Sequence, residues 1–214
     1  MKKISSAALI LAISLCAAAP AAADDTALFK DYKKVFTDYQ TAIDTQQESD
    51  QICYIADISS PEAIGFAFMD LNGDGISELL TGKMPEDEIS AESPVIYDVY
   101  SLVDGSPVLL KSSWLRGRLF LAKEGRIYVS YPMEADYYMD LYEVESGSEE
   151  MRLYKSAFSF QETSCTLVTT DGGVSSPEKV STTSDKFNQF IDETAPEKIE
   201  LRPFTEWYQV KDTI

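Results

Sequence analysis

The central stretch of the chain reads Phe66-Ala67-Phe68-Met69-Asp70-Leu71-Asn72-Gly73-Asp74-Gly75-Ile76-Ser77-Glu78-Leu79-Leu80. Short apolar runs at both ends enclose a polar segment in which Asp70, Asn72, Asp74 and Glu78 carry side-chain oxygens. Alternate residues of a tight loop can place such oxygens around one hard divalent cation, and Ca²⁺ takes about 6–8 of them. The pattern therefore predicts a strand, a calcium-binding loop and a second strand.

The spacing assigns a role to each position of this loop. Counted from the first aspartate, the expected ligands are Asp70, Asn72, Asp74, the backbone carbonyl of Ile76, and Glu78. Gly75 stands at the sharp turn, where a positive φ is required. The side chain of Ile76 is expected to point away from the ion, into the core. A helix–loop–helix EF-hand also needs a bidentate Glu three positions beyond Glu78, but Thr81 stands there, so that version is not expected.

The segment Asp-Leu-Asn-Gly-Asp-Gly-Ile-Ser-Glu resembles the pattern Asp-x-Asn/Asp-x-Asp-Gly-x-x-Asp/Glu. This EF-hand-like calcium loop occurs in FG-GAP and VCBS-type repeats and in small secreted bacterial proteins of unknown function that carry one such hairpin. The resemblance covers about 15–20 residues and implies the same five ligands, but no activity. FG-GAP propellers repeat the motif in every blade, whereas this chain has one copy and no internal period, so a propeller is not expected.

Two alternatives stay open for the loop. Asp, Asn and Gly favour turns by themselves, so the segment could be a turn that binds no ion. An ion bound there could take part in an activity or only brace the fold, and bracing is the commoner use of a lone loop. Bound calcium would neutralise carboxylates that otherwise repel one another, and would stabilise the native state by mass action.

The beginning of the chain has the pattern of a secretory signal peptide over residues 1–23. Two lysines precede an apolar stretch at 4–15, and the small residues at 21–23 suit a cleavage site. Residues 24–214 are then expected to form one secreted domain in the periplasm, on the cell surface or in the medium. Cys16 suggests lipidation, but the leucine before it argues against a lipoprotein signal. No later stretch is long and apolar enough to be transmembrane.

The composition excludes several classes of function. The 214 residues include 36 acidic and 18 basic side chains, a formal net charge of −18, which repels nucleic acid and anionic membranes. There is no histidine, and this excludes Ser-His-Asp and Cys-His catalysis and His-ligated zinc. A non-catalytic calcium-binding module is therefore expected. The alternative is a small carboxylate-dependent hydrolase acting on glycans, which needs only two acidic side chains.

Two cysteines, Cys53 and Cys165, follow the expected cleavage site. In an oxidising compartment such a pair is expected to form a disulfide. The bridge would close a loop of 165 − 53 = 112 residues. In the chain-entropy model that closure contributes about 4–5 kcal/mol. The alternative is a pair of buried free thiols.

The remaining pattern predicts the fold. Apolar residues recur every three or four positions over 27–43, which is typical of one amphipathic helix packed on a sheet. From residue 94 onward, short apolar runs alternate with polar turns, as in antiparallel hairpins. Ser184 is placed to cap a short helix, and residues 199–204 are expected to form a last strand. The predicted class is α+β: an N-terminal amphipathic helix packed on a mostly antiparallel meander sheet, with a short C-terminal helix.

Tyrosines provide the second candidate site. Tyr138, Asp140 and Tyr142 share one face of a predicted strand, because side chains alternate along a strand. Aromatic rings beside a carboxylate can stack on and hydrogen-bond an extracellular glycan or protein ligand. The alternative is that the tyrosines only cover an exposed sheet face, with their rings packed and their hydroxyls in water.

Overall fold

The structure is a computed structural model that describes residues 25–47, 49, 52–53, 55–131, 138–161, 163–171 and 174–214. The predicted signal peptide and Cys16 lie outside these residues. No helix in the described ranges is long and apolar enough to cross a membrane.

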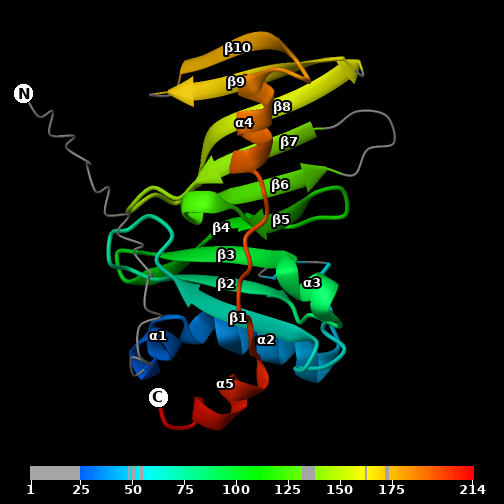
Figure 1. The fold of residues 1–214 in the computed structure, drawn as a ribbon. Coiled ribbons are helices and arrows are strands. Elements are labelled where there is room, and N and C mark those ends of the chain that lie inside the picture. Colours follow the sequence, from blue (N-terminus) through cyan, green and yellow to red (C-terminus); the bar gives the residue numbers. More distant parts are fainter. Residues whose placement is uncertain are drawn as a thin grey trace, which may run out of the picture.

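Among the residues that the structure describes, one antiparallel sheet of 11 strands dominates (Figure 1). The strands are β1 (Ile64–Met69), β2 (Glu78–Lys83), β3 (Ile96–Val103), β4 (Ser106–Ser112), β5 (Arg118–Leu121), β6 (Ile127–Tyr131), β7 (Tyr138–Glu143), β8 (Arg152–Gln161), β9 (Ser164–Asp171), β10 (Val174–Ser181) and β11 (Arg202–Pro203). Their order is β10-β9-β8-β7-β6-β5-β3-β2-β1-β11, and β4 pairs with β3 outside this path. The helices are α1 (Thr26–Asp31), α2 (Lys33–Thr45), α3 (Glu88–Glu92), α4 (Asp185–Glu193) and α5 (Thr205–Val210), with a 3₁₀ turn η1 at Lys123–Gly125.

The predicted class, an N-terminal helix packed on a meander with a short C-terminal helix, is therefore wrong. The fold is mostly sheet, and its helices are few and small. The longest of them, α2, has 13 residues and so extends about 20 Å. Strands lie about 4.8 Å apart, so such a helix covers only a few strands of a sheet this wide. The helical period in the sequence identifies a helix but says nothing about how far the sheet continues beyond it.

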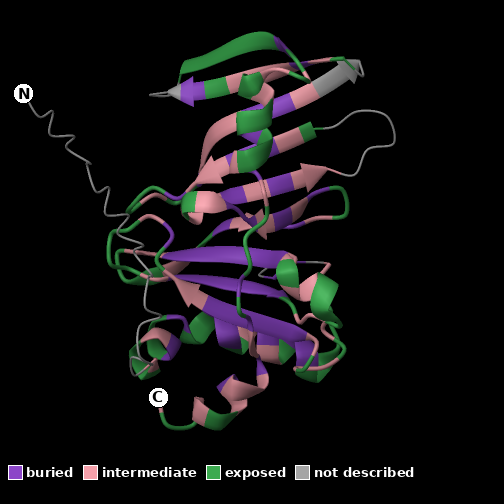
Figure 2. Ribbon diagram, viewed as in Figure 1, coloured by how far each residue is buried: buried purple, intermediate pink, exposed green. Residues whose placement is uncertain are grey.

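The main aromatic core lies where α1 and α2 pack on β1–β3, and Figure 2 shows buried residues concentrated there. Phe36 is central to it, because its ring centroid lies 5.1 Å from those of both Phe66 and Trp207. The predicted single helix is broken into α1 and α2 at Tyr32, which has non-helical backbone angles and is fully buried. The Tyr32 hydroxyl donates to the carbonyl of Ser77, 2.8 Å away, and so ties the break to the β1–β2 loop.

A buried carboxylate fixes the segment that precedes β1. Asp98 on β3 is fully buried and accepts hydrogen bonds from the hydroxyls of Tyr39 and Ser112. It also accepts from the backbone N–H of Cys53 at 2.9 Å. These donors offset the cost of burying a carboxylate, although burial still raises the pKa of Asp98.

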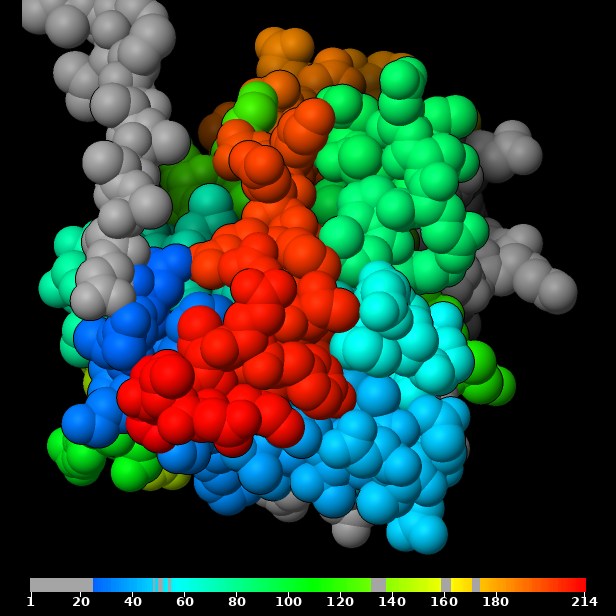
Figure 3. Space-filling model, turned by 90° about the horizontal axis from the view of Figure 1, so that it is seen from below, coloured from blue at the N-terminus to red at the C-terminus, as the bar shows by residue number. Residues whose placement is uncertain are grey.

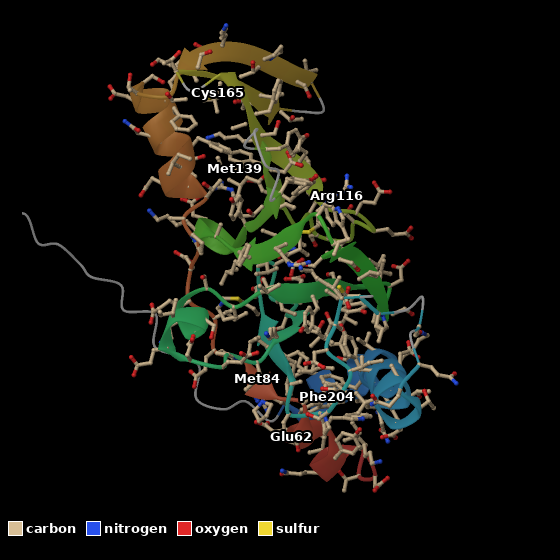
Figure 4. The ribbon with its side chains drawn as sticks, turned by 90° about the vertical axis from the view of Figure 1, so that its right-hand side faces the viewer. Glu62, Met84, Arg116, Met139, Cys165 and Phe204 are labelled. Atoms are coloured by element: carbon tan, nitrogen blue, oxygen red, sulfur yellow. The ribbon has the colours of Figure 1, made fainter. Side chains whose placement is uncertain are left out.

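The predicted disulfide is absent, because Cys53 and Cys165 are both free and buried. Cys53 belongs to the aromatic core that also contains Phe204, whereas Cys165 is on β9, near the opposite edge of the sheet. Figure 4 shows Cys165 and Phe204 at opposite ends of the molecule. Five strand spacings separate β9 from β3, or about 24 Å at 4.8 Å each. Bridged Cα atoms lie less than about 7 Å apart, so this topology excludes the bridge.

The C-terminal segment runs back along the sheet. Helix α4 begins after its N-cap Ser184, as predicted, and the chain then passes β5, where Glu197 N–H donates to Leu121 O at 2.8 Å. Of the predicted last strand at 199–204, only Arg202–Pro203 pairs, as β11 beside β1. Helix α5 was not among the predicted elements. Figure 3 shows this C-terminal segment covering the end of the molecule beside α1 and α2.

Candidate metal centre

The predicted loop connects two paired strands, as expected. Met69 at the end of β1 lies opposite Glu78 at the start of β2, so residues 70–77 close the hairpin. Gly75 has the predicted positive φ, 86°, and Gly73 has a φ of 76°. Glycine adopts this region without the steric cost that a Cβ imposes, so both positions favour the tight turn.

Asp70 organises the loop from its first position. Its Oδ1 accepts from the backbone N–H of Gly73 at 2.7 Å and of Asp74 at 3.2 Å. Its Oδ2 accepts from the N–H of Gly75 at 2.9 Å. One carboxylate therefore satisfies three N–H groups of an exposed turn.

Asn72 and Asp74 form two further turns of the same kind. Asn72 Oδ1 accepts from the N–H of Asp74 at 2.9 Å, and Asp74 Oδ1 accepts from the N–H of Ile76 at 2.8 Å. The Asn72 amide donates to Asp74 Oδ2 at 3.1 Å, so the two side chains are in contact. Hydrogen bonds from the Ser146 hydroxyl and then from the Ile76 N–H lower the pKa of Asp74. The alternate spacing thus gathers three oxygen-bearing side chains within one loop.

The prediction for the Ile76 side chain is wrong, because that side chain is 40% exposed rather than in the core. The position after Gly75 lies on the outer side of the turn. Only its backbone carbonyl was assigned to the ion, and that assignment stays a prediction.

Glu78 lies behind the loop instead of on its surface. It is fully buried, its Oε2 accepts from the N–H of Leu71 at 2.8 Å, and its Oε1 accepts from the Ser101 hydroxyl at 2.9 Å. Burial raises the pKa of Glu78, and the Asp74 carboxylate acts in the same direction, whereas the two hydrogen bonds oppose the rise. The carboxylate therefore joins the base of the loop to β3.

The donor set fits a hard cation better than a soft one. Within the described residues, no three His, Cys, Asp or Glu side chains lie close enough together to hold a metal alone. An ion in this loop would need the Asn72 amide oxygen and a backbone carbonyl beside Asp70, Asp74 and Glu78. Ca²⁺ uses such neutral oxygens together with carboxylates, whereas structural zinc needs thiolates or imidazoles.

Two neighbouring turns hold the loop in place. Asp74 contacts Ser146 in the β7–β8 turn, and Gly125 in the β5–β6 turn packs against the backbone of Leu71. An ion network joins these two turns: Glu143 accepts from Arg126 Nε at 3.0 Å and from Arg152 Nη2 at 2.5 Å. A pocket of about 220 Å³ lies between them and is lined by Leu71, Asn72, Glu124, Gly125, Arg126, Glu143, Val144, Glu145 and Arg152.

Substituting Gly125 tests this packing. Gly125 has a φ of 71°, and an added Cβ would lie 2.1 Å from Leu71 O. We expect Gly125→Ala to lower the free energy of unfolding by about 1–3 kcal/mol beyond the loss that the strain of a positive φ causes, because the added Cβ also overlaps Leu71 O. Gly147→Ala is the matched control, because Gly147 has a φ of 69° and an added Cβ would meet nothing within 4 Å. The strain alone costs about 1–2 kcal/mol. Equal losses in urea unfolding of the two variants would contradict the close contact.

The structure also places residues of the second candidate site, around Asp140, in contact with one another. Asp140 is buried on β7, and its Oδ2 accepts from the Tyr142 hydroxyl at 3.1 Å. It also accepts from the Tyr131 hydroxyl at 2.8 Å. Tyr131, which ends β6 directly opposite Tyr138, was not among the predicted site residues. Its place in an apolar run before a polar segment could have indicated a strand end, but not the register that puts it beside Asp140.

We compared the chain with known proteins in three ways. No protein-family model, no curated protein and no solved structure matched it.

Proposed function

We propose that this protein is a secreted, non-catalytic module whose fold is stabilised by calcium bound in the β1–β2 loop. The ligands in this proposal are Asp70, Asn72, Asp74, the Ile76 carbonyl and Glu78. The observation that supports it most is the convergence of Asp70, Asn72 and Asp74 through shared backbone N–H donors and a direct side-chain contact.

Calcium would supply positive charge where the chain carries mainly negative charge. Three of the five proposed ligands are carboxylates, and the whole chain has a formal net charge of −18. Binding to the native state alone stabilises it by RT ln(1 + [Ca²⁺]/Kd). The ion would hold together two strands, β1 and β2, and through Ser146 and Gly125 the turns that pack on their loop.

The buried acids of the described residues are not arranged as the pair that the alternative hydrolase would need. Three carboxylates are buried in the described part of the chain: Glu78, Asp98 and Asp140. They share no hydrogen-bond partner among the described residues. A glycoside hydrolase needs two carboxyl groups that face the same bond.

Direct binding tests the proposal. Isothermal titration of the chelator-treated mature protein with CaCl₂ is expected to show one site, with Kd in the range of about 10⁻⁴–10⁻³ M typical of extracellular modules. Titration with MgCl₂ is the control, because Mg²⁺ is smaller, demands near-octahedral geometry and gives up its water reluctantly. A chain that binds neither ion, or both equally well, would contradict a dedicated calcium loop.

A further inference from the structure

Four aromatic rings form a continuous row across the β6–β8 part of the sheet. The ring centroid of Trp114, in the β4–β5 connection, lies 5.4 Å from that of Tyr131 on β6. Tyr131 lies 4.7 Å from Tyr138 on β7, and Tyr138 lies 6.3 Å from Phe158 on β8. Tyr131, Tyr138 and Phe158 are directly opposite one another in the strand register, so they share one face. We call these four residues the aromatic row.

Solvent reaches this row. Tyr138 is 36% exposed, and Trp114, Tyr131 and Phe158 are half-buried. The row therefore differs from the aromatic core around Phe36, where the rings are buried. Tyr131 packs edge-to-face against both Trp114 and Tyr138, with interplanar angles of 68° and 78°, whereas the rings of Tyr138 and Phe158 are closer to parallel at 26°.

Asp140 is linked to the aromatic row by a hydrogen bond. Its Oδ2 fixes the Tyr131 hydroxyl, while its Oδ1 is buried and has no hydrogen-bond partner among the described residues. Burial raises the pKa of Asp140, despite the hydrogen bonds from Tyr131 and Tyr142. Burying a carboxylate with one oxygen unpaired is costly. The other oxygen orients the hydroxyls of Tyr131 and Tyr142, whose oxygens can still accept hydrogen bonds.

The surrounding charges restrict the ligand to a neutral one. The Lys111 ammonium on β4 lies 3.6 Å from the centroid of the Tyr142 ring. A cationic ligand that approached Asp140 would therefore meet a like charge. An anionic ligand would meet Asp140 and a chain of net charge −18. The faces and oxygens that remain suit a ligand with apolar C–H faces and many hydroxyl donors, and this is the chemistry of a pyranose sugar.

We propose that the aromatic row binds a neutral glycan, with a sugar ring packed against the exposed ring of Tyr138 and with Asp140 as a positioning residue. The site lies on β6–β8 and the β4–β5 connection, whereas the proposed calcium loop joins β1 and β2. This proposal therefore goes beyond the calcium-stabilised module and does not rest on it.

Affinity electrophoresis in native gels tests the proposal with named neutral probes: laminarin, galactomannan and hydroxyethyl cellulose. We expect at least one of them to retard the mature protein, and Tyr138→Ala to weaken that affinity at least tenfold. Tyr128→Ala is the matched control, because Tyr128 is on β6 facing the other way, in contact with Phe120, and should leave the affinity within twofold. Because Tyr138 also packs against Tyr131 and Phe158, the thermal midpoints of both variants are measured first, and the gels are run at a temperature at which both are folded.

Three outcomes would overturn the proposal: no retardation by any neutral probe, equal loss in the Tyr138→Ala and Tyr128→Ala variants, or retardation only by cationic chitosan or anionic dextran sulfate. Asp140→Asn keeps an acceptor for the Tyr131 hydroxyl and should retain affinity within about threefold, whereas Asp140→Ala should lose at least tenfold. Running the gels with CaCl₂ and with chelator separates this site from the calcium loop. A glycan site that survives Asp74→Ala stands even if calcium binding fails.

Discussion

Calcium is expected to raise the thermal midpoint of the native chain and to leave that of Asp74→Ala unchanged. Asp74 is central to the loop, since it contacts Asn72 and Ser146 and orders the N–H of Ile76. With Kd between about 10⁻⁴ and 10⁻³ M, about 2 mM calcium stabilises the native state by about 0.6–1.8 kcal/mol. For a chain of this size that corresponds to about 1–7 °C. Thermal unfolding followed by circular dichroism, with calcium and with chelator, measures the shift.

The control for this experiment is Asp212→Ala. Asp212 is an exposed carboxylate near the C-terminus, so its removal changes the net charge by the same amount as the loss of Asp74. The Asp212→Ala variant should keep the full calcium response. If Asp74→Ala also keeps it, the ion binds elsewhere. If the native chain shows no shift, the loop is an ordinary Asx-rich turn.

The hairpin around this loop could be predicted because all of its signals are local. Four oxygen-bearing residues at fixed spacing, a glycine at the turn and apolar runs on both sides are enough to specify strand, loop and strand. The structure confirms β1, β2 and the positive φ of Gly75. The outward direction of the Ile76 side chain was not predictable, because it depends on how the turn leaves the sheet.

The errors concern features that depend on distant parts of the chain. A 3.6-residue period continues through Tyr32, but the helix breaks there, and this residue's hydroxyl bonds to Ser77, 45 positions away. The Cys53–Cys165 bridge was inferred from compartment and cysteine number alone. Strand order decides the distance between the two thiols, and the sequence carries no local signal that β5 pairs with β3 while β4 lies off the main path.

Only part of the tyrosine site could be predicted, because only part of it depends on local sequence. Tyr138, Asp140 and Tyr142 alternate along one strand, so their shared face follows from the period of two. Tyr131 and Phe158 join them only through the register of β6 and β8 with β7. Local sequence thus identified the strand that carries the carboxylate, but not the neighbours that turn one strand face into a row of rings.

Glu78→Gln is expected to change the stability of the chain in opposite directions with and without calcium. Without calcium, the buried carboxylate is a cost, since burial raises its pKa. Gln has nearly the same shape and keeps an acceptor for the Leu71 N–H, so the variant should be as stable as the native chain or more stable. With calcium, the loss of one charged ligand should weaken Kd at least tenfold, which is about 1.4 kcal/mol of binding free energy. At about 2 mM calcium this lowers the free energy of unfolding by about 0.5–1.1 kcal/mol.

The pH dependence checks the same carboxylate independently. An acid whose pKa is higher in the folded state binds its proton more tightly when folded, so its contribution to stability is lost as the pH rises above its ordinary value, 4.5. In chelator, the native chain should therefore lose more stability than Glu78→Gln in urea unfolding as the pH rises above 4.5. Parallel pH profiles would mean that Glu78 carries no burial cost. An unchanged calcium affinity in Glu78→Gln would limit Glu78 to joining Leu71 and Ser101, and would leave the ion to the exposed part of the loop.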